Sequence, residues 1–193
     1  MNPMSIIETV SESDVTGLAA ELYAEDIEDM GYVPSHTRVM AINPEAVRAF
    51  ENLIRAIAGP MDKRRYELVT LAAAAGARSR HCRLAHGQRS LRYMDEDTVV
   101  SASTDYANSP DLTDAEKAMM AFAERVSTDS SGMTDADSLV LRGHGFSDRE
   151  IVDIALAAAA RNYYSRAVQA LAVDVDVPPA LNERMVDALV HGL

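Results

Sequence analysis

Alanine, leucine and valine dominate the apolar positions of this chain. No stretch shows the alternation of apolar and polar residues, bounded by turns, that is typical of a strand. Helix-start signals are frequent instead. Thr113 and Ser147 are each followed three residues later by glutamate, the capping-box pattern, and Asn43 precedes a proline at a first helical position. The pattern predicts an all-α protein with helices over residues 13–30, 44–58, 62–77, 80–93, 114–128, 135–142, 148–172 and 179–191.

The polar stretch 94–112 separates two helical halves, and we expect it to be a connection. The chain has 193 residues, of which 48% are hydrophobic, so it is long and apolar enough to bury a sizeable core. The prediction is one helical domain over residues 1–193, with halves at about 13–93 and 113–191.

The two halves contain similar segments. Residues 67–79 and the segment 83 residues later are identical at seven of thirteen positions. Four of these identities are alanine, which two alanine-rich helices would share by chance, but the glutamate and the arginine at the two ends also match. We interpret the similarity as an internal duplication whose small residues let the two helices pack closely. Beyond it, Cys82 and His86 align with Ser165 and Gln169, so only the first half keeps a thiol and an imidazole.

Four residues of the first half form a candidate reactive site. Ser79 is a suitable N-cap for the next predicted helix, which places Cys82 near its third position. There the free amides and the helix dipole favour a thiolate. His86 lies one turn later on the same face and is a candidate base or proton relay. Glu67, on the preceding helix, is expected to fold back over this pair and orient the imidazole.

Charge is distributed unevenly along the chain. Eighteen Lys and Arg against thirty Asp and Glu give a net charge of -12, which argues against a general nucleic-acid binder or a protein held on anionic membranes. Residues 63–92 nevertheless contain eight basic residues and one acidic residue, Glu67. We expect this positive field to increase the reactivity of Cys82. The same arginines are equally suited to an anionic substrate or to acidic patches of a neighbouring subunit.

Cys82 is the only cysteine, which excludes an intrachain disulfide. No uncharged apolar run reaches about 18 residues, so no transmembrane helix is expected. The first twelve residues lack the basic region of a secretion signal. These features predict a soluble, cytoplasmic protein.

The candidate site also has structural interpretations. A single cysteine is usually a small buried apolar side chain, and a single histidine on a mixed helix is usually structural. A metal site formed by His81, Cys82 and His86 is disfavoured because adjacent residues point in different directions and a fourth ligand is not apparent. We therefore expect no metal and no cofactor. The remaining histidines have no evident partners and are expected at the surface or at helix caps: His36, His144 and His191.

Glu67, Ser79, Cys82 and His86 together resemble the Glu…Cys-x-x-Cys-x-x-x-His signature of AhpD-like alkylhydroperoxidases, part of the carboxymuconolactone decarboxylase superfamily. The resemblance extends over about residues 15–185. It is closest to the branch called peroxidase-related enzymes, through the segments 31–34, 61–70, 82–87 and 159–164.

The resemblance implies an all-helical AhpD-like fold with an internal repeat, and a homo-oligomer that is commonly a trimer or a hexamer. In AhpD-like enzymes two cysteines cycle between dithiol and disulfide while they reduce a hydroperoxide, and the glutamate and histidine form a proton relay. By position, Glu67 and His86 match this relay, Cys82 matches the second cysteine, and Ser79 takes the place of the first.

Ser79 removes the thiol that would resolve a sulfenic acid on Cys82. Its hydroxyl is still able to cap the helix or to hydrogen-bond the sulfur. The prediction is therefore a one-cysteine peroxidase that acts on a small peroxide or a small anionic or organic compound and uses an external thiol. Two alternatives stay open: a non-redox acid–base enzyme of the decarboxylase type built on His86 and Glu67, and a non-catalytic oligomer that binds small molecules.

Overall fold

A computed structural model describes residues 6–193 of the chain, and within these residues it is all-α, without a strand. The helices are α1 (Gly17–Met30), α2 (Ser35–Met40), α3 (Pro44–Ala58), α4 (Lys63–Gly76), α5 (Arg80–Ser90), α6 (Glu96–Asp105), α7 (Asp114–Asp129), α8 (Asp135–Gly143), α9 (Asp148–Ala170) and α10 (Glu183–Val190), with a 3₁₀ turn, η1 (Ser130–Gly132), after α7. The predicted fold class is thus confirmed. No helix of the described part is long and apolar enough to cross a membrane.

Helices α3, α7 and α9 begin where their capping residues predicted, whereas α1 and α10 begin four residues after the predicted starts at 13 and 179, because Thr16 and Asn182 occupy their N-cap positions. Thr113 and Ser147 each accept a hydrogen bond from the backbone N–H of the glutamate three residues later, and that glutamate bonds back to the cap. Asn43 Oδ1 accepts from the backbone N–H of Ala46 at 3.1 Å, and α3 covers the predicted range 44–58. Because these bonds satisfy amides that have no partner within the helix, the starts are set locally by the sequence.

Two helices lie outside the predicted set. The six-residue α2 falls between two predicted helices, and α6 occupies residues 96–105 of the stretch expected to be a connection. Asp95 caps α6 by accepting from the backbone N–H of Thr98 at 2.8 Å. The stretch was predicted as a connection because serine, threonine and aspartate dominate it. Val99 and Ala102 are nevertheless fully buried, because α6 packs against α10 and α4.

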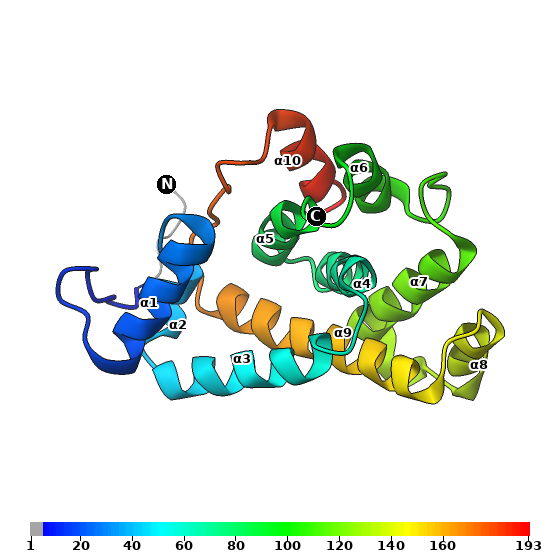
Figure 1. Cartoon of the computed structure of the whole chain (residues 1–193), viewed down its shortest axis with the longest axis horizontal. Helices are drawn as coiled ribbons and strands as arrows, with labels where there is room; N and C mark the ends of the chain where they lie inside the picture. The colour runs from blue at the N-terminus through cyan, green and yellow to red at the C-terminus, as the bar shows by residue number, and fades with distance from the viewer. Residues whose placement is uncertain (1–5) are drawn as a thin grey trace.

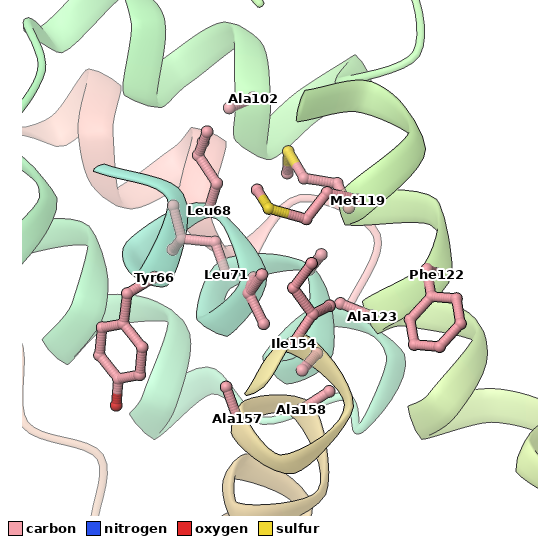
Figure 2. Packing of buried hydrophobic residues seen from close by; sticks show 14 of the residues in the cluster. Tyr66, Leu68, Leu71, Ala102, Met119, Phe122, Ala123, Ile154, Ala157 and Ala158 are labelled. Carbon is pink, nitrogen blue, oxygen red and sulfur yellow. The ribbon is translucent and has the colours of Figure 1, made fainter. Parts of the chain in front are cut away.

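Helix α4 lies in the middle of the molecule, in contact with α5, α7 and α9 (Figure 1). Figure 2 shows Leu71 of α4, Met119 of α7 and Ile154 of α9 gathered in the main core, with alanines of α9 beside them. Because those alanines are small, α9 approaches α4 closely, as the two similar segments predicted. Tyr66 of α4 belongs to the same cluster, and its ring lies on the side away from Met119 and Phe122 (Figure 2).

A tight turn between α4 and α5 carries the candidate site. Arg78 adopts a left-handed conformation, with φ 54°, and the backbone N–H of Ser79 donates to Ala74 O at 2.9 Å. The turn reverses the chain, so α5 packs back against α4. On its other side α5 meets α10 at Gly87, where a Cβ atom would lie only 2.3 Å from Leu189 Cδ1. These contacts hold α5 between α4 and α10.

Candidate active site

Cys82 lies in the first turn of α5, directly after the turn that follows α4. Ser79 is fully buried and caps α5, its Oγ accepting from the backbone N–H of Cys82 at 3.4 Å. Cys82 itself is 3% exposed. The cap expected at Ser79 is thus present, and it acts on the backbone of Cys82.

The sulfur of Cys82 receives its hydrogen bonds from α9. Ser165 Oγ donates to Sγ at 3.1 Å, and Arg161 Nη1 donates to it at 3.6 Å. Ser165 stands 83 residues after Cys82, at the aligned position of the second similar segment. The two donors hold the sulfur at the contact between α5 and α9.

His86 and Glu67 form a buried pair next to the cysteine. His86 Nδ1 and Glu67 Oε2 lie 2.7 Å apart, and the two side chains are 3% and 7% exposed. Burial lowers the pKa of His86 to about 4, with Arg161 adding to this effect and Glu67 opposing it. Burial alone would raise the pKa of Glu67, but His86, Arg89 and Arg161 outweigh it and leave that pKa below its ordinary value.

At neutral pH the pair therefore consists of a neutral imidazole and a carboxylate. The hydrogen bond to Glu67 requires Nδ1 of His86 to carry the proton, which leaves Nε2 as the basic nitrogen. A buried imidazole held in one tautomer by a carboxylate is suited to take a proton from a thiol or a substrate and to return it.

A cavity of about 420 Å³ lies over these groups. Its wall contains Cys82, His86 and Arg161, and its apolar part comes from side chains of α3, α4 and α9: Phe50, Ile54, Tyr66 and Tyr164. The size is that of pockets that hold small organic molecules, whereas one water occupies only about 30 Å³ of liquid. The cavity therefore has room for an organic molecule beside the sulfur.

The basic residues of 63–92 do not gather around the cysteine, which corrects the expected positive field. Arg83 is 2% exposed and donates to backbone carbonyls, among them Leu189 O at 2.8 Å and Ser103 O at 2.7 Å. Burial lowers the pKa of Arg83 to about 10. Arg64 pairs with Glu116 at 2.7 Å. Of the eight, only Arg89 borders the cavity, so the arginine nearest to the sulfur comes from α9.

The other histidines divide into two groups. His144 and His191 are exposed and cap the C-terminal ends of α8 and α10, as expected. His36 was expected at the surface or at a cap, but it borders the cavity and meets the ring of Tyr164 edge-on at 5.7 Å. His81 Nε2 lies 2.8 Å from Val173 O. Across residues 6–193, no three His, Cys, Asp or Glu side chains are grouped so as to hold a metal ion.

The structure thus brings Glu67, Ser79, Cys82 and His86 together, and it adds two groups from the second half. The sequence analysis included Arg161 only as a match of the duplication and within the segment 159–164 of the resemblance, without a role in the site, and Ser165 only as the residue aligned with Cys82. The duplication was a signal for Ser165. Cys82 and Ser165 are equivalent positions of two similar segments, and equivalent positions can meet where such segments pack against each other.

The fold is shared with several solved structures. The chain superimposes on the AhpD core of an uncharacterised peroxidase-related protein from Ralstonia eutropha JMP134, with a TM-score of 0.80, 23% identity and 98% of each chain covered. A peroxidase-related protein from Silicibacter sp. TM1040 matches with a TM-score of 0.78 and 23% identity, over 91% of this chain and 95% of that one. The debrominase Bmp8, as a cysteine-to-alanine variant with 2,3,4-tribromopyrrole, matches with a TM-score of 0.80 and 19% identity, over 95% and 97%.

These matches establish the AhpD-like helical fold, and the predicted resemblance is confirmed at that level. Comparison with protein-family models gave no match, and comparison with curated proteins gave none either.

The buried pair makes the stability of the fold dependent on pH. His86 has a folded-state pKa of about 4, below the value of about 6.5 for an exposed histidine, so between these values the unfolded chain binds a proton that the folded chain does not. The free energy of unfolding should therefore fall as pH drops from 7 to 5, by about 2 kcal/mol for His86. Urea unfolding at the two pH values measures the change.

Comparison of His86→Ala with His144→Ala separates the contribution of His86 to this pH dependence from the contributions of other groups. His36 has a lowered pKa as well and acts in the same direction, whereas His144 is exposed. The His86→Ala variant should lose a clear part of the pH dependence, and His144→Ala should keep all of it. Equal pH dependence in wild type and His86→Ala would contradict a neutral His86.

Proposed function

We propose that this protein is a thiol-dependent peroxidase that reduces an organic hydroperoxide through Cys82 and is regenerated by an external thiol. The observation that carries the proposal is the setting of the sulfur, which borders an organic-sized cavity and accepts hydrogen bonds from Ser165 and Arg161. A neutral imidazole, His86, shares the cavity wall. The cavity wall thus combines a nucleophile, Cys82, with a base, His86, and the cavity provides the space for a substrate.

The reaction would proceed in two stages. The sulfur of Cys82 attacks the outer peroxide oxygen, the O–O bond breaks, and the electron pair leaves with the alkoxide. His86 takes the thiol proton and returns it to the alkoxide, so the products are a sulfenic acid and an alcohol. One external thiol then forms a mixed disulfide with Cys82 and releases water, and a second thiol restores Cys82 and leaves as a disulfide.

The proposal is tested by trapping the sulfenic acid. One equivalent of cumene hydroperoxide should yield one equivalent of cumyl alcohol and a protein that gains a single dimedone adduct at Cys82, measured by mass spectrometry. Addition of dithiothreitol before dimedone should prevent the adduct. Alcohol formation without oxidation of Cys82 would contradict the proposal and favour an acid–base reaction or a binding function.

Ser79→Cys is the informative variant for the second stage. It places a thiol at the cap of α5, three residues before Cys82, where AhpD-like enzymes carry their first cysteine. Oxidation should then end in an intrachain disulfide, and the dimedone adduct should largely disappear while the alcohol is still formed. Persistence of the full adduct would show that position 79 does not reach the oxidised sulfur.

Reductive dehalogenation is a second candidate, favoured by the shared fold of the debrominase with 2,3,4-tribromopyrrole and by the aromatic wall of the cavity. The thiolate would take the bromine, the ring carbon would accept a proton, and two external thiols would then release bromide and restore Cys82. Bromide release from 2,3,4-tribromopyrrole with dithiothreitol, measured by ion chromatography, distinguishes this activity from peroxide reduction.

The homo-oligomer implied by the resemblance is also a proposal. Several large apolar side chains of α8 and α9 are exposed: Leu139, Val140, Val152, Leu156 and Tyr163. Association with a second copy that covers them would remove their apolar area from water. Light scattering coupled to size exclusion measures the mass in solution.

A further inference from the structure

Arg161 is the charged group of the cavity wall whose hydrogen bonding is incomplete. It is 6% exposed, and its Nε has no hydrogen-bond partner among residues 6–193. Arg161 forms no ion pair with a carboxylate of residues 6–193, and its side-chain hydrogen bond goes to the Cys82 sulfur at 3.6 Å. Burial opposes its charge, but Cys82, Tyr66 and Glu67 together hold the pKa of Arg161 above its ordinary value. The guanidinium is therefore buried, charged and short of an acceptor.

The other charged groups around the cavity have partners. Glu25 and Glu51 both accept from Arg48, at 2.7 and 2.9 Å, and Asp29 accepts from Arg92 at 2.8 Å. Asp26 accepts from the hydroxyl of Thr37. Glu67 is bonded to His86. The carboxylates of the cavity wall thus all have hydrogen-bond partners in the protein, and three of them are paired with arginines, whereas the arginine beside the sulfur has no carboxylate partner.

We propose that Arg161 forms a carboxylate-binding subsite next to Cys82, so that the preferred substrate of the proposed reaction is a small organic acid that presents its reactive atom to the sulfur. A carboxylate accepts charge-assisted hydrogen bonds from a guanidinium, and a site without competing water strengthens them. The apolar wall would hold the carbon skeleton of the acid. This inference rests on the proposed function only in assigning Cys82 as the reacting group.

Alkylation of the single cysteine tests the subsite directly. Iodoacetate and iodoacetamide are nearly the same size and form the same thioether bond to Cys82, with loss of iodide, but only iodoacetate carries a carboxylate. The ratio of their rate constants is independent of how much of Cys82 is ionised, because ionisation affects both reagents equally. It therefore reports recognition of the carboxylate alone.

We expect Arg161→Gln to lower the iodoacetate-to-iodoacetamide ratio by about tenfold, as for the loss of one charge-assisted hydrogen bond. Arg161→Lys, which keeps the charge, should lower it less. The matched control is Arg78→Gln, which removes the same charge from the aligned, exposed position of the first half and should leave the ratio within about twofold. An unchanged ratio in Arg161→Gln would overturn the inference and assign Arg161 to the sulfur alone.

A second measurement uses the unmodified protein, in case Arg161→Gln does not fold. Sodium benzoate should slow the iodoacetamide reaction of wild-type Cys82 at concentrations at which benzamide has no effect. Equal protection by the two compounds would contradict a carboxylate subsite. Both measurements are independent of peroxide turnover, so a failure of the peroxidase proposal would leave their outcome intact, and the reverse is also true.

Discussion

Replacing Cys82 with serine is expected to reduce dithiothreitol-dependent turnover of cumene hydroperoxide on the order of 1,000-fold or more. Cys82 is the only sulfur atom in the chain that is able to act as a thiol, because the sequence contains one cysteine. A serine hydroxyl in the same place keeps the size and the helix position but is a far weaker nucleophile and forms no sulfenic acid. The rate of peroxide loss, followed with a ferrous-ion assay, measures the effect.

The fold of the Cys82→Ser variant should be unaffected, because the new hydroxyl is able to accept the hydrogen bond from Ser165 that the sulfur accepts now. An unchanged far-ultraviolet circular dichroism spectrum and cooperative thermal unfolding are the controls. Turnover at the wild-type rate would exclude the peroxidase proposal. If another reaction of this protein survives in Cys82→Ser and is lost in His86→Ala, the non-redox acid–base alternative takes its place.

Replacing His86 with alanine is expected to lower peroxide turnover by about 100-fold or more, which is the usual contribution of a positioned acid–base group. The loss should reside in the step in which Cys82 is oxidised, because His86 moves the proton from the thiol to the leaving oxygen. Single-turnover oxidation of Cys82, with the alcohol quantified by chromatography, isolates this step. His144→Ala, at an exposed helix cap, is the matched control and should retain wild-type turnover.

Glu67→Gln separates the positioning role from the proton transfer itself. Glutamine keeps a hydrogen-bonding group near Nδ1 of His86, at the site of the 2.7 Å contact, but it removes the charge. Because Glu67 raises the pKa of His86 against the effect of burial, the variant should shift the acid limb of the pH–rate profile to lower pH. A merely structural role for Glu67 would change stability and leave the profile of the folded enzyme in place.

Much of the fold follows from short-range signals. The reciprocal bonds of Thr113 with Glu116 and of Ser147 with Glu150 join residues three apart, so the helix starts that they define are readable in the sequence. Helix α6 has a similar cap at Asp95, but its few apolar residues do not predict a helix by themselves. They become core residues only because α6 packs against α10 and α4. A helix that depends on such long-range packing shows little apolar periodicity of its own.

The candidate site likewise has one part that follows from spacing along a single helix and another that depends on long-range packing. The spacing of three and four residues is enough to place Ser79, Cys82 and His86 along one side of a single helix, with Ser79 as its N-cap. The arginine beside the sulfur is set by long-range packing instead. Arg83 is next to Cys82 in the chain but donates to backbone carbonyls of α4 and α10, whereas Arg161 contacts the sulfur from 79 residues away. Chain proximity does not predict side-chain direction, and the packing of α9 against α4 and α5 places Arg161 and Ser165 at the thiol.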